Sequence, residues 1–237
     1  MLEKIKESLN NAPKVSIDDV TQFFKTHEGS YGAHDKFLRI KVPTLRNLAK
    51  DFYECDFKTL EGLIYSPYNE ERFLALVILI KKFEKGPSST KKICFEFYLK
   101  HLNQVNNWNL VDASAHLIIG RYLFDKKKNF LWDLACSQNM WFRRISIIST
   151  WYFIKKGYFQ TTLEVAMMLL YDEQDLIHKA VGWMLREIGK KNQEIEEEFL
   201  KKHYKTMPRT MLRYAIEKFS EEKKKFYMKK VKILNNL

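Results

Sequence analysis

Apolar residues recur at the spacing of an α-helix along almost the whole chain, and no segment alternates apolar and polar residues as a strand does. Only 8 glycines and 5 prolines occur in 237 residues, which leaves few of the tight turns that a β-sandwich or barrel needs. The hydrophobic content of 46% is ample for a continuous core. We therefore expect an all-α protein in which short loops join the helices.

The helix-period segments fall into pairs, and a new pair begins about every 26 to 38 residues, close to the period of helical-hairpin repeats. This spacing predicts about six hairpins stacked as an α-solenoid. Two further helices are expected in residues 1–42, with the Gly/His segment 29–34 between them. The helices expected after residue 42 cover 43–54, 56–66, 69–84, 88–101, 107–120, 126–137, 140–154, 159–171, 175–192, 193–204, 207–217 and 220–233.

One helix in several of these hairpins opens with a basic residue that a small residue follows three positions later. The pairs are Arg72 with Ala75, Arg143 with Ser146, and Lys179 with Gly182. Small residues let helices approach closely, and basic residues at equivalent places in a curved stack would form a stripe on its concave face. The alternative is that such charges are solvated surface and intrahelical ion pairs. The candidates for the stripe are Arg72, Arg143, Arg144, Lys179, Arg186, Arg209 and Arg213.

The chain carries a formal charge of +12, which favours polyanionic partners such as nucleic acid or an anionic membrane. Its longest apolar run, residues 73–80, is far short of the roughly 20 residues that a membrane-spanning helix needs. The N-terminus has no apolar region of the kind that marks export. Cys55, Cys94 and Cys136 are an odd number without metal-ligand spacing, so we interpret them as buried thiols of a cytoplasmic protein.

Trp108 and Asp112 are the most informative pair for function, because four residues separate them on one expected helix and both cover the same patch of its surface. An aromatic face attracts a cationic group, and a carboxylate ionised at neutral pH stabilises developing positive charge. Trp183 is crowded by the basic residues Lys179 and Arg186 in a comparable way.

The remaining tryptophans and the histidines carry no comparable signal. Trp132, Trp141 and Trp151 are interpreted as core residues. The six histidines are scattered at positions 27, 34, 101, 116, 178 and 203, and nucleotide-binding, hydrolase and zinc motifs are absent from the sequence. We expect neither a metal nor an organic cofactor.

At these residues the chain resembles the AlkD family of bacterial DNA glycosylases, which repair alkylation damage and are built from HEAT-like repeats. The resemblance runs from the segment Phe37–Pro43 to the C-terminal helices. Its specific parts are Trp108 with Asp112, the helix start Trp141–Arg144, and the stretch from Lys179 through Trp183 to Arg186. The family's N-terminal aromatic residue near the DNA has no clear counterpart, and Tyr31 is the candidate.

The resemblance implies a right-handed α-solenoid that grips duplex DNA with a concave basic face and hydrolyses the N-glycosidic bond of positively charged N3- or N7-alkylated purines. Asp112 would be the catalytic carboxylate, while Trp108 and Trp183 would hold the deoxyribose and backbone of the lesion. Arg144 and Arg186 would contact phosphate. The lesion would not enter a deep base pocket, unlike the usual base-flipping strategy.

We expect residues 1–237 to form one domain in which residues 1–42 cap the solenoid. The protein would act as a monomer in the bacterial cytoplasm, associated with the nucleoid when bound to DNA. The competing hypothesis is a noncatalytic HEAT-like scaffold that binds nucleic acid or protein through the same surface. The joint presence of Trp108, Asp112, Trp183 and Arg144 favours the enzyme.

Overall fold

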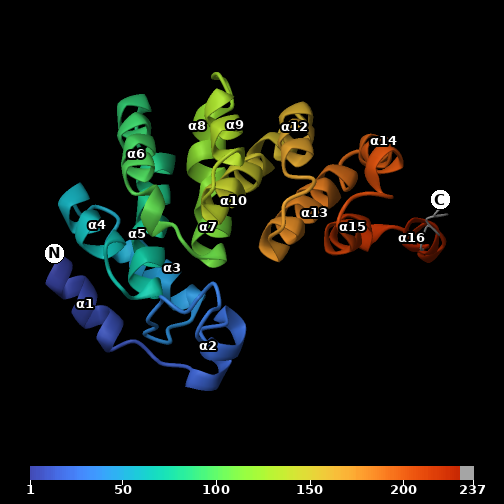
Figure 1. Cartoon of the computed structure of the whole chain (residues 1–237). Helices are drawn as coiled ribbons and strands as arrows, with labels where there is room; N and C mark the ends of the chain where they lie inside the picture. Colours follow the sequence, from blue (N-terminus) through green and yellow to red (C-terminus); the bar gives the residue numbers. More distant parts are fainter. Residues whose placement is uncertain (230–237) are drawn as a thin grey trace. The chain divides into compact units, whose positions relative to one another are not determined.

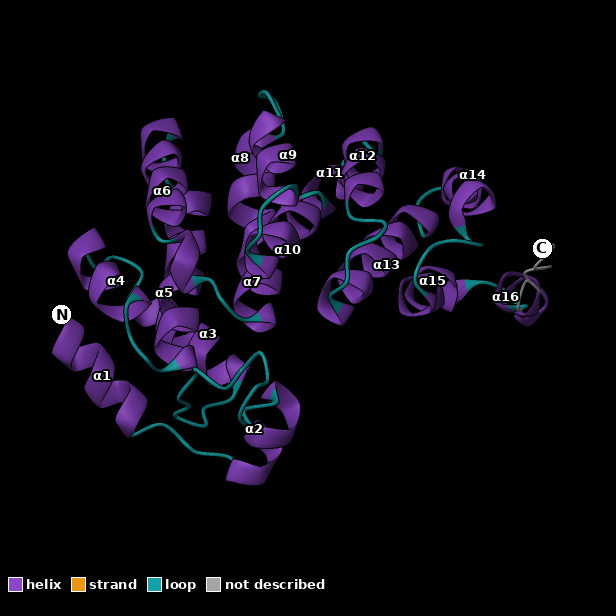
Figure 2. Ribbon diagram, in the orientation of Figure 1, coloured by secondary structure: helices purple, strands orange, loops and turns teal. Residues whose placement is uncertain are grey.

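The computed structural model describes residues 1–229, and all of their regular structure is helical (Figures 1 and 2). Two isolated backbone bridges, Lys14 with Ile40 and Lys36 with Tyr68, are the β-type pairs found among these residues. The all-α prediction is therefore confirmed. Backbone contacts divide the chain into a first unit, Met1–Tyr122, and a second unit, Leu123–Leu237.

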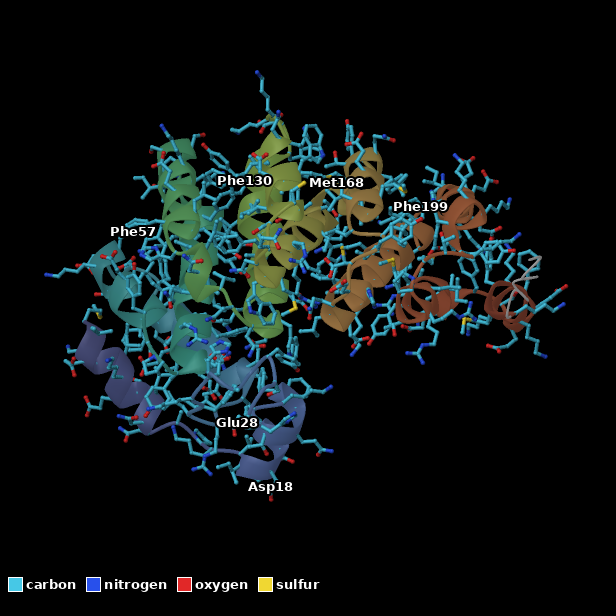
Figure 3. All side chains as sticks on the ribbon, viewed as in Figure 1. Asp18, Glu28, Phe57, Phe130, Met168 and Phe199 are labelled. Atoms are coloured by element: carbon cyan, nitrogen blue, oxygen red, sulfur yellow. The ribbon has the colours of Figure 1, made fainter. Side chains whose placement is uncertain are left out.

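The first unit is built around a long, almost completely buried helix, α5, which packs against α3, α4, α6 and α7. Aromatic contacts tie the surrounding helices together, since the ring of Phe57 at the start of α4, labelled in Figure 3, lies 5.7 Å from that of Phe97 on α6. The helices of this unit are α1 (Leu2–Asn10), α2 (Ile17–Phe24), α3 (Val42–Asp51), α4 (Phe57–Ile64), α5 (Asn69–Lys85), α6 (Ser88–Lys100), the 3-10 helix η1 (Leu102–Gln104), α7 (Trp108–Ala115) and the π-helical turn η2 (His116–Gly120), and α8 (Arg121–Leu123) crosses its boundary.

The N-terminal segment differs from the expectation in one respect. Both of its helices precede Gly29, because α2 ends at Phe24 and the next residue, Lys25, has a left-handed φ of 49° that stops the helix. The Gly/His segment 29–34 therefore lies in the long loop that follows α2, drawn in teal in Figure 2, and not between α1 and α2. The prediction of two helices in this segment is confirmed, but the predicted position of the loop is wrong.

The second unit is centred on α13, which packs against α10, α12, α14 and α15. A Cβ at Gly182 of α13 would lie 2.3 Å from the carbonyl oxygen of Met211 on α15, so the close helix approach expected at Gly182 is confirmed. The helices of this unit are α9 (Asn129–Ala135), α10 (Met140–Ser149), α11 (Trp151–Lys155), α12 (Gln160–Met168), α13 (Asp175–Gly189), α14 (Gln193–His203), α15 (Arg209–Ala215), the 3-10 helix η3 (Ile216–Lys218) and α16 (Glu221–Met228).

The expected helices agree with the observed ones to within a few residues over 43–228, apart from the expected helix 140–154, which is divided at Thr150 into α10 and α11. The end of the expected helix 220–233 lies outside the described residues. Cys55 and Cys94 are buried as expected, and burial raises the pKa of both thiols, that of Cys94 to about 11. Cys136 is exposed, so the prediction was wrong for this thiol, which follows the last residue of α9.

Across residues 1–229, every helix is too short or too polar to cross a lipid bilayer.

Candidate functional site

Trp108 and Asp112 lie on one face of α7, as their spacing predicts, and both are half-buried. The helix begins at Trp108 because Asn107 caps it, its Oδ1 accepting the backbone N–H of Trp108 at 2.7 Å. Asp112 lies close enough to the buried hydroxyl of Tyr98 that its charge, after burial itself, raises the pKa of Tyr98. Tyr98 is therefore neutral at physiological pH, with its hydroxyl 2.9 Å from Ser114 Oγ.

Two phenylalanines of α2 pack against Trp108, and the sequence reasoning missed both. The ring of Phe24 stacks on Trp108 at 5.5 Å between centroids, and the ring of Phe23 meets it edge-on at 5.0 Å. Phe23 is 61% exposed although it is a large apolar residue. The aromatic rings beside Trp108 thus come from α2, whereas Tyr31 lies in the loop that follows.

The sequence feature that could have indicated these contacts is the adjacency of Phe23 and Phe24. Adjacent helical residues point about 100° apart, so the two rings of such a pair leave a short helix in different directions. The same rings line a pocket of about 770 Å³ whose other walls come from the rest of α2, the segments that flank this helix, α3, α5 and Asn109 of α7.

A second hollow of the first unit is lined by three cations and one acid, Glu84. It has a volume of about 580 Å³, lies among α3, α5, α7 and η2, and includes Ala113, the residue after Asp112. Its cations are Arg46, Lys50 and Lys81, none of which forms an ion pair within the described part of the chain. These three were not among the contacts predicted from the sequence, since they fall in the middle or at the end of helices and not at the helix starts.

Arg72 does not lie on an accessible face. It is 3% exposed, its Nη1 donates to the carbonyl of Ser66 at 2.9 Å, and its Nη2 pairs with the buried carboxylate of Asp35. Arg143 is used in the same way, with Nη1 donating to the carbonyl of Ser137 at 2.9 Å and Nε to Asp172 Oδ2 at 2.6 Å. Each guanidinium group both closes a loop and pairs with a carboxylate, so we leave these two arginines out of the proposed DNA contacts.

These interactions form a recurring structure that we call the loop clasp: a side chain in the first turns of a helix donates to the backbone carbonyl six residues earlier. Arg72 donates to Ser66 and Arg143 to Ser137, and the ring of His178 contacts the carbonyl of Asp172 in the same register. By this register Lys179 corresponds to Arg144 and not to Arg143. The sequence spacing had aligned Lys179 with Arg72 and Arg143, whereas in the structure the equivalent residue is His178, one position earlier.

Trp183 lies on α13 of the second unit in a mixed aromatic and charged environment. Its indole N–H donates to Glu187 Oε1 at 3.1 Å, and its ring lies 5.0 Å from that of Trp151. Lys155 Nζ lies 3.9 Å above the ring of Trp151, and burial lowers the pKa of this lysine while the charge of Glu187 raises it. Trp151, predicted as a core residue, is half-buried and belongs to this cluster.

The other basic candidates of the second unit differ in exposure. Arg144 is 5% exposed, and its guanidinium donates to the carbonyl of Leu176 on α13. Arg186, also on α13, pairs with Glu217, and Lys179 pairs with Asp175 at 2.7 Å. Arg209 and Arg213 are exposed on α15, with Arg209 Nη2 donating to the carbonyl of Met228 at 2.6 Å.

The two units thus carry different parts of the predicted site. The first holds Trp108 and Asp112, and the second holds Trp183 with Arg144 and Arg186. Within residues 1–229 no group of three or more His, Cys, Asp or Glu side chains could hold a metal ion.

Residues 7–219 match the family model described as DNA alkylation repair enzyme, so the chain belongs to this family. Membership supports an enzymatic role in the repair of alkylated DNA. Among solved structures, the chain is similar to one titled "Predicted DNA alkylation repair enzyme from Enterococcus faecalis", with a TM-score of 0.66 and 16% sequence identity over 89% of this chain and 99% of that one. This likeness establishes the fold alone. A comparison with curated proteins gave no match.

Proposed function

We propose that this protein is a DNA glycosylase that hydrolyses the N-glycosidic bond of positively charged N3- and N7-alkylated purines in duplex DNA. The observation that carries the proposal is the pairing of Trp108 and Asp112 on one face of α7 in a member of a DNA alkylation repair family. The protein would act as a cytoplasmic monomer without a metal or organic cofactor.

The chemistry requires stabilisation of positive charge on the sugar. As the base departs, the deoxyribose passes through an oxocarbenium-like state, and a carboxylate such as that of Asp112 stabilises this state or orients the attacking water. The π face of Trp108 adds a cation-π attraction of about 0.5 to 2 kcal/mol, depending on desolvation. An alkylated purine already carries a positive charge and leaves readily, so a general acid is not needed.

Binding of the duplex is assigned to cations of both units that do not form a loop clasp. In the first unit these are Arg46, Lys50 and Lys81, which line the hollow beside Ala113. In the second unit we propose Arg144, Lys179, Arg186, Arg209 and Arg213 as phosphate contacts, with Trp183 against the lesion backbone. Contacts to phosphate are independent of sequence, so binding should show little sequence preference.

The test is to incubate the purified protein with methylated duplex DNA and to identify the bases that are released. We expect 7-methylguanine and 3-methyladenine to be freed, and a neutral lesion such as hypoxanthine in the same duplex to be freed much more slowly. Duplex binding without the release of any base would contradict the proposal and favour a noncatalytic scaffold.

A further inference from the structure

A buried carboxylate lies behind the first turn of α7. The side chain of Asp35 is completely buried, and its Oδ2 accepts hydrogen bonds from Asn107 Nδ2 at 2.7 Å and from Asn69 Nδ2 at 2.8 Å. Its Oδ1 pairs with Arg72 and lies 3.3 Å from His34 Nε2. Each oxygen therefore has two polar neighbours, and a buried carboxylate held by several hydrogen bonds keeps its neighbours in one geometry.

This hub reaches both residues that flank Trp108. Asn107 caps α7 through its own Oδ1 while its Nδ2 is bound to Asp35, so a single amide joins the helix cap to the hub. On the other side, Asn109 Nδ2 donates to Asn69 Oδ1 at 2.7 Å, and Asn69 Nδ2 lies 3.3 Å from Asn109 Oδ1. Trp108 is thus bracketed by two amides that both lead to Asp35.

The position of Asp35 is itself fixed by the first turn of α5. The carboxylate of Glu70 accepts backbone N–H groups from Leu38 at 2.8 Å and from Arg39 at 2.7 Å. The loop that follows Asp35 therefore closes around the Glu70 carboxylate. The backbone of Lys36 pairs with the same helix start, its carbonyl accepting the N–H of Asn69 at 2.8 Å. The loop before α3 is therefore attached to α5, and α7 is attached to that loop.

We infer that Asp35 is a positioning residue of the proposed glycosylase: through Asn107 and the Asn69–Asn109 pair it sets the orientation of Trp108 and, one helical turn later, of the Asp112 carboxylate. This inference rests on the proposed function. Asp35 touches neither substrate nor reacting atoms in this role, but groups that act on a transition state lose efficiency when they are displaced by about 1 Å, by a factor on the order of 10².

The second unit offers a matched control. Asp172 pairs with Arg143 through Nε at 2.6 Å and Nη2 at 3.3 Å, and Arg143 clasps the Ser137 carbonyl as Arg72 clasps that of Ser66. Asp172 thus supports the same kind of loop clasp, but no hydrogen bond in the described structure links it to Asn107 or Asn109. Replacing Asp172 by Asn therefore reproduces the loss of a clasp carboxylate without touching the start of α7.

The experiment compares Asp35→Asn with Asp172→Asn in the full chain. The first readout is the single-turnover rate of 7-methylguanine release, together with the Kd for unmodified duplex. The second is ¹⁹F NMR of protein labelled with 5-fluorotryptophan. The chain has five tryptophans, and the resonance that disappears in Trp108→Phe is that of Trp108.

For Asp35→Asn we expect a loss of release of about a hundredfold, a Kd within about twofold, and a shifted or broadened Trp108 resonance. For Asp172→Asn we expect release within about threefold and an unchanged Trp108 resonance.

Asn107→Ser gives an independent variant in case Asp35→Asn does not fold. Serine keeps the helix cap but is too short to reach Asp35, so only the link to the hub is lost. We expect the same change in the Trp108 resonance and a loss of release of at least about tenfold. A wild-type resonance and rate in Asn107→Ser would overturn the inference. If the native chain releases no base, the proposed function fails, and the Trp108 resonance still decides whether Asp35 positions this ring.

Discussion

A basic side chain at the start of a helix can close the preceding loop or contact a phosphate, and its partners decide which. Arg72 and Arg143 each donate to a loop carbonyl and pair with a carboxylate, so their charge is neutralised within the protein. Arg46 and Lys81 form no ion pair in the part of the chain that the structure describes, and they line an open hollow. We therefore expect substitutions in these two groups to affect different measurements.

Arg143→Ala should lower the free energy of unfolding by about 3 kcal/mol, because it leaves Asp172 without its cation and releases the Ser137 clasp. Its effect on the salt dependence of duplex binding should be negligible.

Lys81→Ala should leave stability unchanged and reduce the slope of log Kobs against log salt by about one phosphate contact. Denaturant unfolding and duplex titrations over a salt series measure both quantities, and a reduced slope for Arg143→Ala would place Arg143 on the DNA.

The sequence could not separate these two uses of arginine. The carboxylate partners are distant along the chain, 37 residues away for Arg72 and 29 residues away for Arg143. At Arg72 and Arg143 the recurrence at helix starts therefore corresponds to the loop clasp, and the predicted stripe of DNA contacts stays a prediction for the other basic residues. The Trp108–Asp112 pair was predictable because both residues lie on one helix, where spacing alone fixes their common face.

At the scale of the helix, α14 contains a buried acid that the chain neutralises by protonation. Glu196 is 1% exposed, its carboxyl packs against Gly189, and Oε1 has no hydrogen-bond partner among the described residues. Burial, with the neighbouring charge of Glu197, raises the pKa of Glu196 to about 9, although Arg186 opposes the shift. The folded chain therefore keeps a proton that the unfolded chain releases near pH 4.3.

This difference makes stability depend on pH in a defined direction. Below about pH 4.3 the Glu196 carboxyl is protonated in both the folded and the unfolded chain. Between that pH and about 9 only the folded chain holds the proton. The free energy of unfolding therefore falls as pH rises through this range, by up to about 1.4 kcal/mol per pH unit. Glu196→Gln should remove this loss, with a gain over the native chain that grows from pH 5 to pH 9. Denaturant midpoints at pH 5, 7 and 9 test it, with the exposed Glu198→Gln as control. Parallel curves for Glu196→Gln and the native chain would contradict the assignment.

The helices themselves were largely predictable, because apolar residues recur with a period of 3.6 along most of the sequence. The N-terminal region was harder, since residues 26–41 are irregular and are held by contacts with α5 that no local pattern reveals. The same loop supplies Asp35, and the helix before it supplies Phe23 and Phe24. The parts of the site contributed by this region were therefore among those that the sequence did not predict.

At the scale of the whole molecule, duplex binding is assigned to basic side chains and bond hydrolysis to an acidic one. A chain of net charge +12 attracts duplex DNA through many cations, and the loss of any one changes affinity modestly. Catalysis is assigned to one half-buried carboxylate, that of Asp112. Removing this charge without changing the shape of the side chain should therefore separate the two activities.

Asp112→Asn is the most direct test of this separation. We expect the variant to bind methylated duplex with a Kd within about twofold of that of the native chain, because the phosphate contacts are intact. We expect its single-turnover release of 7-methylguanine and 3-methyladenine to fall by a factor on the order of 10³, the loss of a charge aligned with the transition state. Unaltered release by Asp112→Asn would contradict the account.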